Sequence, residues 1–170
     1  MRLFIAVQLN DPMKQFVQDV QADFRAQHIR GNYSPIENLH LTLAFIGEYS
    51  DPDAVLDVME TVSFSPFTVT MNEVGCFGDI WWTGFEDNEA LEALARRLKH
   101  ALSDAGIPFD RKRFKAHCTF LRRPEYPAGR RPVPAQFEPV SMRVESISLM
   151  RSDRGKHGMI YTEVGSVEAE

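Results

Sequence analysis

The sequence predicts an α+β fold in which most strands pair antiparallel. The order of strand-like and helix-like segments along the chain favours this class. The two halves of the chain also resemble each other, because a shift of 77 residues aligns His40 with His117 and Leu3 with Ile80. Each half then contains a strand, a capped helix, a loop and a strand with a histidine. We expect residues 1–170 to form a single domain built of two intertwined lobes.

The first half begins with a strand over Arg2–Leu9, in which Leu3, Ile5 and Val7 alternate with other residues. Asn10-Asp11-Pro12 supplies a cap and an early proline for an amphipathic helix that ends near Gln27. We expect a loop over Gly31–Asn38, then an apolar strand over Leu39–Ile46. Ser50-Asp51-Pro52 starts a second helix.

The second half has the same types of element. The pattern predicts strands over Phe67–Val74, Ile80–Phe85 and Lys115–Leu121, and a helix between Asn88 and Gly106. Prolines and arginines predict an irregular loop over Arg123–Pro139. We expect the segments Val140–Met150 and Met159–Val164 to close the chain as a hairpin.

Composition places the chain among ordinary globular proteins, with 44% hydrophobic and 25% charged residues. The longest apolar runs are far shorter than the roughly 20 residues of a membrane span. The N-terminal apolar run is too short for a signal peptide, and a chain with two cysteines and no export signal is expected to be a reduced, cytoplasmic protein. We therefore expect no membrane partner.

Charge is distributed unevenly along the chain. The formal net charge is −5, which by itself disfavours a nucleic-acid partner. Residues 111–131, however, hold eight basic side chains and one acidic one, a net charge of +7, and the remaining residues hold −12. The basic side chains are Arg111, Lys112, Arg113, Lys115, Arg122, Arg123, Arg130 and Arg131. A local RNA-binding surface is therefore compatible with an acidic protein.

Two short motifs are the strongest functional signal in the sequence. They are His40-Leu41-Thr42-Leu43 and His117-Cys118-Thr119-Phe120. Residues two apart in a strand face the same side, so each motif presents an imidazole beside a hydroxyl and buries an apolar face. Threonine occurs only seven times in the chain, so two such pairs among five histidines are improbable by chance.

Paired imidazoles suit acid–base chemistry at phosphorus. With an ordinary pKa of about 6.5, one imidazole can take a proton while the other gives one. Thr42 and Thr119 are then placed to donate hydrogen bonds to phosphoryl oxygens. The residues alone do not decide which histidine is the donor. Neither strand offers the further ligands that zinc requires, so we expect no metal and no cofactor.

The paired motifs resemble those of the two-histidine (2H) phosphoesterases, and most closely the RNA 2′,3′-cyclic phosphodiesterases of the 2′-5′ RNA ligase family. The resemblance extends over nearly the whole chain and includes Arg2–Val7, the two motifs, Arg122 and the strand with Tyr161. It implies a bilobal fold, in which two antiparallel sheets related by a pseudo-two-fold axis carry outer helices and enclose a central cleft. It also implies metal-independent hydrolysis of a terminal 2′,3′-cyclic phosphate to a 2′-phosphate.

Roles for individual residues follow from the same resemblance. It implies that His40 is the proton donor to the departing 3′ oxygen and that His117 is the proton acceptor that activates water. Thr42, Thr119 and Arg122 would bind the phosphate. Strict alternation, however, puts Arg122 on the face of Phe120, away from the histidines, unless the strand ends or twists there. RNA with a 2′,3′-cyclic phosphate end is the expected partner, tRNA fragments included, and the protein is expected to be a monomer.

Further residues complete the expected site. The aromatic candidates for stacking a terminal base are Tyr33, Trp81, Trp82 and Phe85. His157 lies in the predicted hairpin turn, within reach of the mouth of the cleft. Three alternatives remain open: an RNA-end-binding module without turnover, a phosphodiesterase for a small cyclic phosphate or 2′-5′ oligonucleotide, and 2′-5′ RNA ligation.

Overall fold

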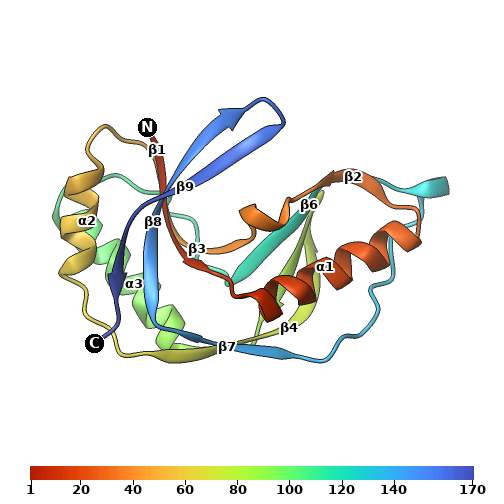
Figure 1. Cartoon of the computed structure of the whole chain (residues 1–170), viewed down its shortest axis with the longest axis horizontal. Helices are drawn as coiled ribbons and strands as arrows, with labels where there is room; N and C mark the ends of the chain where they lie inside the picture. The colour runs from red at the N-terminus through yellow and green to blue at the C-terminus, as the bar shows by residue number, and fades with distance from the viewer.

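Two antiparallel β-sheets form the centre of the molecule, and three α-helices cover them, in a computed structural model that describes residues 1–170 (Figure 1). The first sheet has the order β3-β1-β8-β9, with β3 (His40–Glu48), β1 (Arg2–Gln8), β8 (Ser146–Gly155) and β9 (Gly158–Glu168). The second has the order β2-β6-β5-β4-β7, with β2 (Arg30–Tyr33), β6 (His117–Glu125), β5 (Ile80–Phe85), β4 (Phe67–Phe77) and β7 (Val140–Val144).

The three α-helices begin where the capping residues predict. They are α1 (Asp11–Ala26), α2 (Pro52–Glu60) and α3 (Glu89–Asp104). The side chains of Asn10, Asp51 and Asn88 accept hydrogen bonds from backbone amides three residues later, at 3.0, 3.1 and 3.0 Å. Two short 3₁₀ turns complete the structure, η1 (Ile36–Asn38) and η2 (Pro127–Gly129).

The internal repeat is visible in the pairing of the strands. β1 pairs with β3 in one sheet and β5 pairs with β6 in the other, both antiparallel. The helix between each pair covers the opposite sheet, because α1 packs against β6 and β7 whereas α3 packs against β3. The chain also crosses between the sheets at α2 and again between β7 and β8. The fold is thus α+β with two antiparallel sheets and outer helices, as the sequence predicts, and the structure adds that the helices are exchanged between the sheets.

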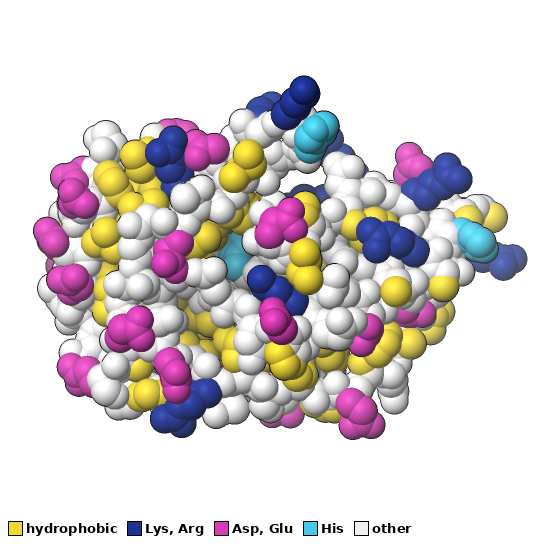
Figure 2. All heavy atoms as spheres, viewed as in Figure 1, with side chains coloured by type: hydrophobic (Ala, Val, Ile, Leu, Met, Phe, Trp, Pro, Cys, Tyr) yellow, Lys and Arg dark blue, Asp and Glu magenta, His cyan; other side chains and the backbone are white.

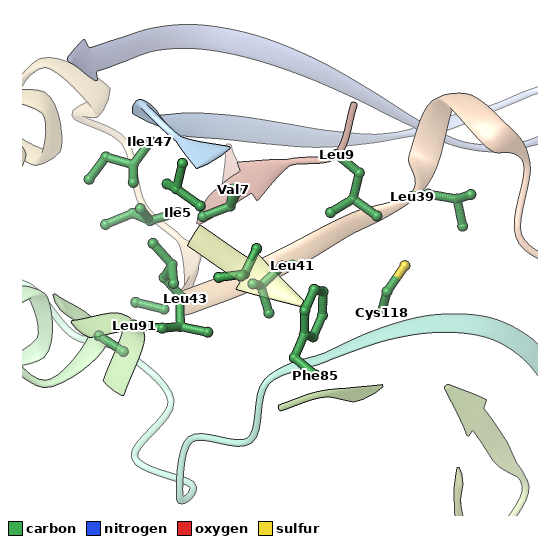
Figure 3. Close-up of a cluster of buried hydrophobic side chains, with 14 of the residues drawn as sticks. Ile5, Val7, Leu9, Leu39, Leu41, Leu43, Phe85, Leu91, Cys118 and Ile147 are labelled. Atoms are coloured by element: carbon green, nitrogen blue, oxygen red, sulfur yellow. The ribbon is translucent and has the colours of Figure 1, made fainter. Parts of the chain in front are cut away.

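One apolar core joins the two sheets. Leu41 and Leu43 from β3 point into it, as do Val7 from β1 and Phe85 from β5 (Figure 3). Cys118 from β6 lies in the same cluster and is fully buried. The alternate residues of β3 and β6 are therefore left to face the space between the sheets. No helix is long and apolar enough to cross a membrane.

Three sequence predictions about elements are wrong. The expected loop over Gly31–Asn38 contains the end of β2 and the turn η1, because β2 is a short polar edge strand without an apolar alternation. The expected loop from Arg123 begins later, since β6 continues to Glu125. The expected strand Val140–Met150 is two strands: β7 pairs with β4 and β8 pairs with β1, so the chain changes sheets at Glu145.

Candidate active site

A polar cleft of about 710 Å³ lies between the two sheets and contains both histidine motifs. His40 and Thr42 reach it from β3, and His117 and Thr119 reach it from β6. In Figure 2, histidine side-chain atoms are visible recessed in the middle of the face shown. The residues that line the cleft are Arg25, Gly31, Asn32, Tyr33, Ser34, Pro35, Asn38, His40, Thr42, His117, Thr119, Arg122, His157, Gly158, Met159 and Tyr161.

His40 is packed and hydrogen-bonded on both ring nitrogens. Its Nδ1 lies 2.7 Å from the carbonyl oxygen of Asn38, and its Nε2 lies 2.9 Å from the hydroxyl of Thr42. The carbonyl can only accept, so Nδ1 holds a proton and Nε2 faces the cleft. The rings of Phe4 and Tyr161 lie 4.7 and 5.3 Å from the imidazole, centroid to centroid.

The surroundings of His40 disfavour its protonation. Burial lowers the pKa of His40 below its ordinary value, and the positive charges of His117 and Arg122 act in the same direction. The hydrogen bond to the Asn38 carbonyl opposes this shift but does not cancel it. His40 is therefore neutral at pH 7 in the free protein.

His117 has the same backbone anchor in a more open position. Its Nδ1 lies 2.6 Å from the carbonyl oxygen of Lys115, two residues earlier in the chain. The Nδ1 of His40 contacts the carbonyl of Asn38 with the same two-residue spacing. Its Nε2 has no hydrogen-bond partner. Phe77 and Trp82 flank the ring, at centroid distances of 5.7 and 6.4 Å. His117 thus presents an unoccupied nitrogen to the cleft.

A β-bulge brings Arg122 into the cleft. Thr119 pairs with Trp82 and Leu121 pairs with Trp81, so Phe120 has no partner in β5. This extra residue reverses the alternation, and Phe120 and Leu121 are both buried. Strict alternation therefore does not hold along β6, and Arg122 lines the cleft together with both histidines instead of sharing the face of Phe120.

Comparisons with known proteins identify the family of the chain. The profile of the 2'-5' RNA ligase superfamily matches residues 9–156. This chain belongs to the 2'-5' RNA ligase superfamily.

Individual relatives cover most of the chain. An RNA 2',3'-cyclic phosphodiesterase of Thermotoga maritima is 27% identical over 95% of this chain and 91% of its own length. The crystal structure of a Thermus thermophilus protein matches with a TM-score of 0.83 and 29% identity, over 99% of this chain and 97% of that one. Escherichia coli LigT complexed with 3'-AMP matches with a TM-score of 0.81 and 27% identity, over 99% and 97%.

The aromatic residues of this superfamily member are placed differently from the sequence prediction. Tyr33 lines the cleft as expected, with the Arg25 guanidinium 4.1 Å from its ring centroid. Trp81, Trp82 and Phe85 are buried, each at most 7% exposed, and do not line the cleft, so Tyr33 is the one of the four candidates that lies there. They are buried because β5 lies between two other strands with helices and neighbouring side chains over it.

Several cleft residues escaped sequence reasoning. Arg25 comes from the last turn of α1, and Tyr161 comes from β9, so neither lies near a motif in the sequence. Asn38 both orients His40 and donates its amide to the carbonyl of Met159, at 2.9 Å, which ties the β8–β9 hairpin to η1. His157, at the tip of this hairpin, also lines the cleft.

The two cysteines are free, and Cys118 faces the core, away from the cleft. Burial raises the pKa of the Cys118 thiol to about 12, so the thiol is protonated at neutral pH. Nucleophilic or metal-binding thiolate chemistry is thereby excluded at this position. The groups that face the cleft are imidazoles, hydroxyls and guanidinium groups, which can transfer protons and bind a phosphate.

Proposed function

We propose that this chain hydrolyses the terminal 2′,3′-cyclic phosphate of RNA to a 2′-phosphate, with His40 and His117 as paired acid and base. The observation that carries the proposal is the pair of histidines, each anchored through Nδ1 to a backbone carbonyl and facing one cleft with two threonines and Arg122. Both imidazoles need a fixed orientation to transfer protons along a line through phosphorus, and the carbonyls provide it.

The proposed step balances without a metal or cofactor. Water attacks the phosphorus atom, and its proton passes to Nε2 of His117. The bond between phosphorus and the 3′ oxygen breaks, and His40 donates the proton that makes a 3′ hydroxyl. The products are a 2′-phosphate, a neutral His40 and a protonated His117, which exchange protons with solvent before the next turnover.

Substrate binding favours protonation of His40 by a proton taken up from solvent. In the free protein the pKa of His40 is lowered, because the ring is partly buried and lies near His117 and Arg122. A cyclic phosphate in the cleft brings a negative charge against these groups, and a nearby negative charge favours imidazolium. We therefore infer that His40 is protonated together with substrate binding, while the open position of His117 leaves it free to act as the base.

Thr42, Thr119 and Arg122 are the proposed phosphate ligands. The two hydroxyls lie on the cleft face beside the histidines, and Arg122 offers two parallel N–H donors to the phosphate oxygens. Tyr33 is the proposed platform for the terminal base. The names of the Thermotoga maritima relative and the 3'-AMP in Escherichia coli LigT support a cleft for nucleotide phosphates.

The test is product analysis with a nucleoside 2′,3′-cyclic phosphate in the presence of EDTA. We expect complete conversion to the 2′-phosphate alone. A 3′-phosphate product would reverse the assignment of the leaving oxygen, and loss of turnover with EDTA would contradict the metal-independent step. Tight binding of the substrate without product would identify an RNA-end-binding module instead.

The superfamily name favours a second reaction of the same site. If a 5′ hydroxyl of RNA replaces water as the nucleophile, the same proton transfers produce a 2′-5′ phosphodiester and a free 3′ hydroxyl. Adding an RNA with a 5′ hydroxyl in large excess should then give a joined product that depends on both histidines. We also propose that residues 1–170 form one domain, which acts as a cytoplasmic monomer on RNA ends.

A further inference from the structure

The basic residues of segment 111–131 form two groups at opposite ends of β6. Arg111, Lys112, Arg113 and Lys115 precede the strand, and Arg122, Arg123, Arg130 and Arg131 lie at its end or beyond. Because a strand rises about 3.4 Å per residue, Lys115 and Arg122, the nearest members of the two groups along the chain, are separated by roughly 24 Å. An RNA chain that leaves the cleft in one direction can meet only one of them.

The group before β6 lies among acidic side chains. Arg113 and Lys115 line a hollow together with Glu73, Glu86, Asp87 and Glu92. The ammonium group of Lys115 is also placed over the ring of Trp82, 4.6 Å from its centroid. These acids repel RNA phosphates, so this end of β6 is a poor path for RNA.

The group after β6 is joined by further basic residues from other elements. Arg25 and Arg122 both line the cleft. Arg30 lies at the outer end of β2, which pairs with β6. Arg130 and Arg131 line a second hollow with His28, just beyond β2. We name Arg25, Arg30, Arg122, Arg123, Arg130 and Arg131 the basic strip.

The basic strip is continuous and its charges are not neutralised. β2 connects the cleft, which it borders at Gly31–Tyr33, to the hollow bordered by residues 27–29. All six arginines are exposed, and none takes part in an ion pair. The one exposed acid on β6 is Glu125, opposite Arg30. Figure 2 shows several Lys and Arg side chains at the end of the molecule where β2 lies and many Asp and Glu side chains at the end with α2, with some of each charge elsewhere on this face.

Backbone strain marks the same end of the molecule. The three non-glycine residues with positive φ are His28, Arg123 and Ala128, at +64°, +52° and +51°. They lie in the connection before β2, near the end of β6 and in η2. Such conformations persist only where the surroundings enforce them, and they concentrate at functional sites.

We propose that the RNA chain on the 5′ side of the cyclic end leaves the cleft along β2 and lies on the basic strip, with its phosphates bound by Arg30, Arg123 and Arg130. The inference rests on the proposed function for the identity of the bound end. The new content is the path of the RNA chain away from the cleft along β2. The substrate on this path is a single-stranded oligonucleotide rather than a free nucleotide. Tyr33 beside Arg25 offers the first base a stacking surface on this path.

The test compares two triple variants that remove equal charge from the two ends of β6. The strip variant is Arg30→Gln/Arg123→Gln/Arg130→Gln, and the matched control is Arg111→Gln/Lys112→Gln/Arg113→Gln. Each is assayed with an octaribonucleotide ending in a 2′,3′-cyclic phosphate and with a nucleoside 2′,3′-cyclic phosphate. We expect the strip variant to lose about tenfold or more of the preference for the octamer at low salt, because three phosphate contacts are removed. The control should retain that preference within about twofold.

Salt dependence gives a reading that does not need turnover. Binding of a labelled octaribonucleotide with a 3′-phosphate is measured by anisotropy at 50 and 200 mM KCl. Each phosphate contact on a single strand contributes about 0.7 to the slope of log affinity against log salt, so the strip variant should lose about 2 from that slope. An equal loss in the control, or an unchanged slope in the strip variant, would overturn the proposal.

Two further comparisons keep the outcomes separate. Arg123 has a positive φ, so the double variant Arg30→Gln/Arg130→Gln and thermal unfolding of every variant identify any loss that comes from misfolding. Failure of the wild-type protein to turn over either substrate would contradict the proposed function, while the anisotropy slopes would still decide on the basic strip.

Discussion

The strands β3 and β6 have the same length and the same local geometry but present their histidines differently. In both, the imidazole Nδ1 contacts the carbonyl two residues earlier, and the residue after the threonine is a bulge without a partner. His40, however, is covered by Phe4 and Tyr161 and bonded to Thr42, whereas Nε2 of His117 is unpartnered. The repeated backbone positions two imidazoles alike, but the surrounding side chains cover His40 and leave Nε2 of His117 open.

Each strand has an unpaired bulge residue after its threonine, Leu43 in β3 and Phe120 in β6. Two residues further on, the side chains of Phe45 and Arg122 lie on the faces of Thr42 and Thr119, and these two side chains differ in character. Phe45 packs with Phe4 in a small apolar cluster, and Arg2 lies over its ring at 5.0 Å. Arg122 instead adds a positive charge to the cleft. The β3 side therefore holds its histidine in an apolar setting, and the β6 side supplies the charge that binds phosphate.

Removing either imidazole has the largest expected effect. His40→Ala and His117→Ala should each lower kcat by about 10²–10⁴-fold on a nucleoside 2′,3′-cyclic phosphate, the usual contribution of a positioned acid or base. The exposed His100, on α3, provides the control, and His100→Ala should keep wild-type turnover. Full activity in both cleft variants would contradict the assignment of the site.

Replacing Arg122 in β6 has the next largest expected effect. Arg122→Lys keeps a positive charge but loses the paired donors, and hydrogen bonds to charged groups contribute about 1.5–3 kcal/mol. We expect kcat/KM to fall roughly 10–100-fold. The same substitution at Arg113, outside the cleft, is the control. If Arg122→Lys matches the wild type, Arg122 does not bind the phosphate.

The pH profile tests the unlike environments directly. Because the pKa of His40 is lowered by burial and by the charges of His117 and Arg122, its protonated fraction falls as pH rises through a value below 6.5. The pH dependence of the His40 imidazole NMR signals in the free protein should therefore have its midpoint below 6.5. Arg122→Gln should move this midpoint to higher pH, because it removes a positive charge near the imidazole. A midpoint at or above 6.5 in the wild type would contradict the pKa direction.

The smallest expected effect is on stability. A histidine whose folded-state pKa lies below its unfolded value of about 6.5 gives the unfolded chain more protons between those two values. The free energy of unfolding should therefore rise with pH up to about 6.5 and level off above it. Denaturant unfolding at pH 5 and 7.5 should show a smaller rise in His40→Gln than in the wild type. An identical rise in both proteins would mean that His40 titrates normally.

Much of the fold and site is predictable from the sequence because its signals are local. Helix caps act within three residues, and strand alternation fixes which side of β3 and β6 faces the cleft. Strict alternation alone does not place Arg122 in the cleft, because a bulge depends on the partner strand, here β5, and not on the residues of β6 alone. Arg25 and Tyr161 are not predictable from the motifs, because they enter the cleft from elements distant in the sequence. The sequence does not select Tyr33 among the four aromatic candidates, because burial depends on how the other elements pack around β5.

The division of roles between the two histidines is tested most directly with a 2′,3′-cyclic phosphate in which sulfur replaces the 3′ oxygen. A thiolate has a far lower pKa than an alkoxide and leaves without a proton, so the donor becomes dispensable while the base remains necessary. We predict that His40→Ala hydrolyses this analogue at close to the wild-type rate and that His117→Ala retains its full defect of about 10²–10⁴-fold. Rescue of His117→Ala instead of His40→Ala would contradict the account.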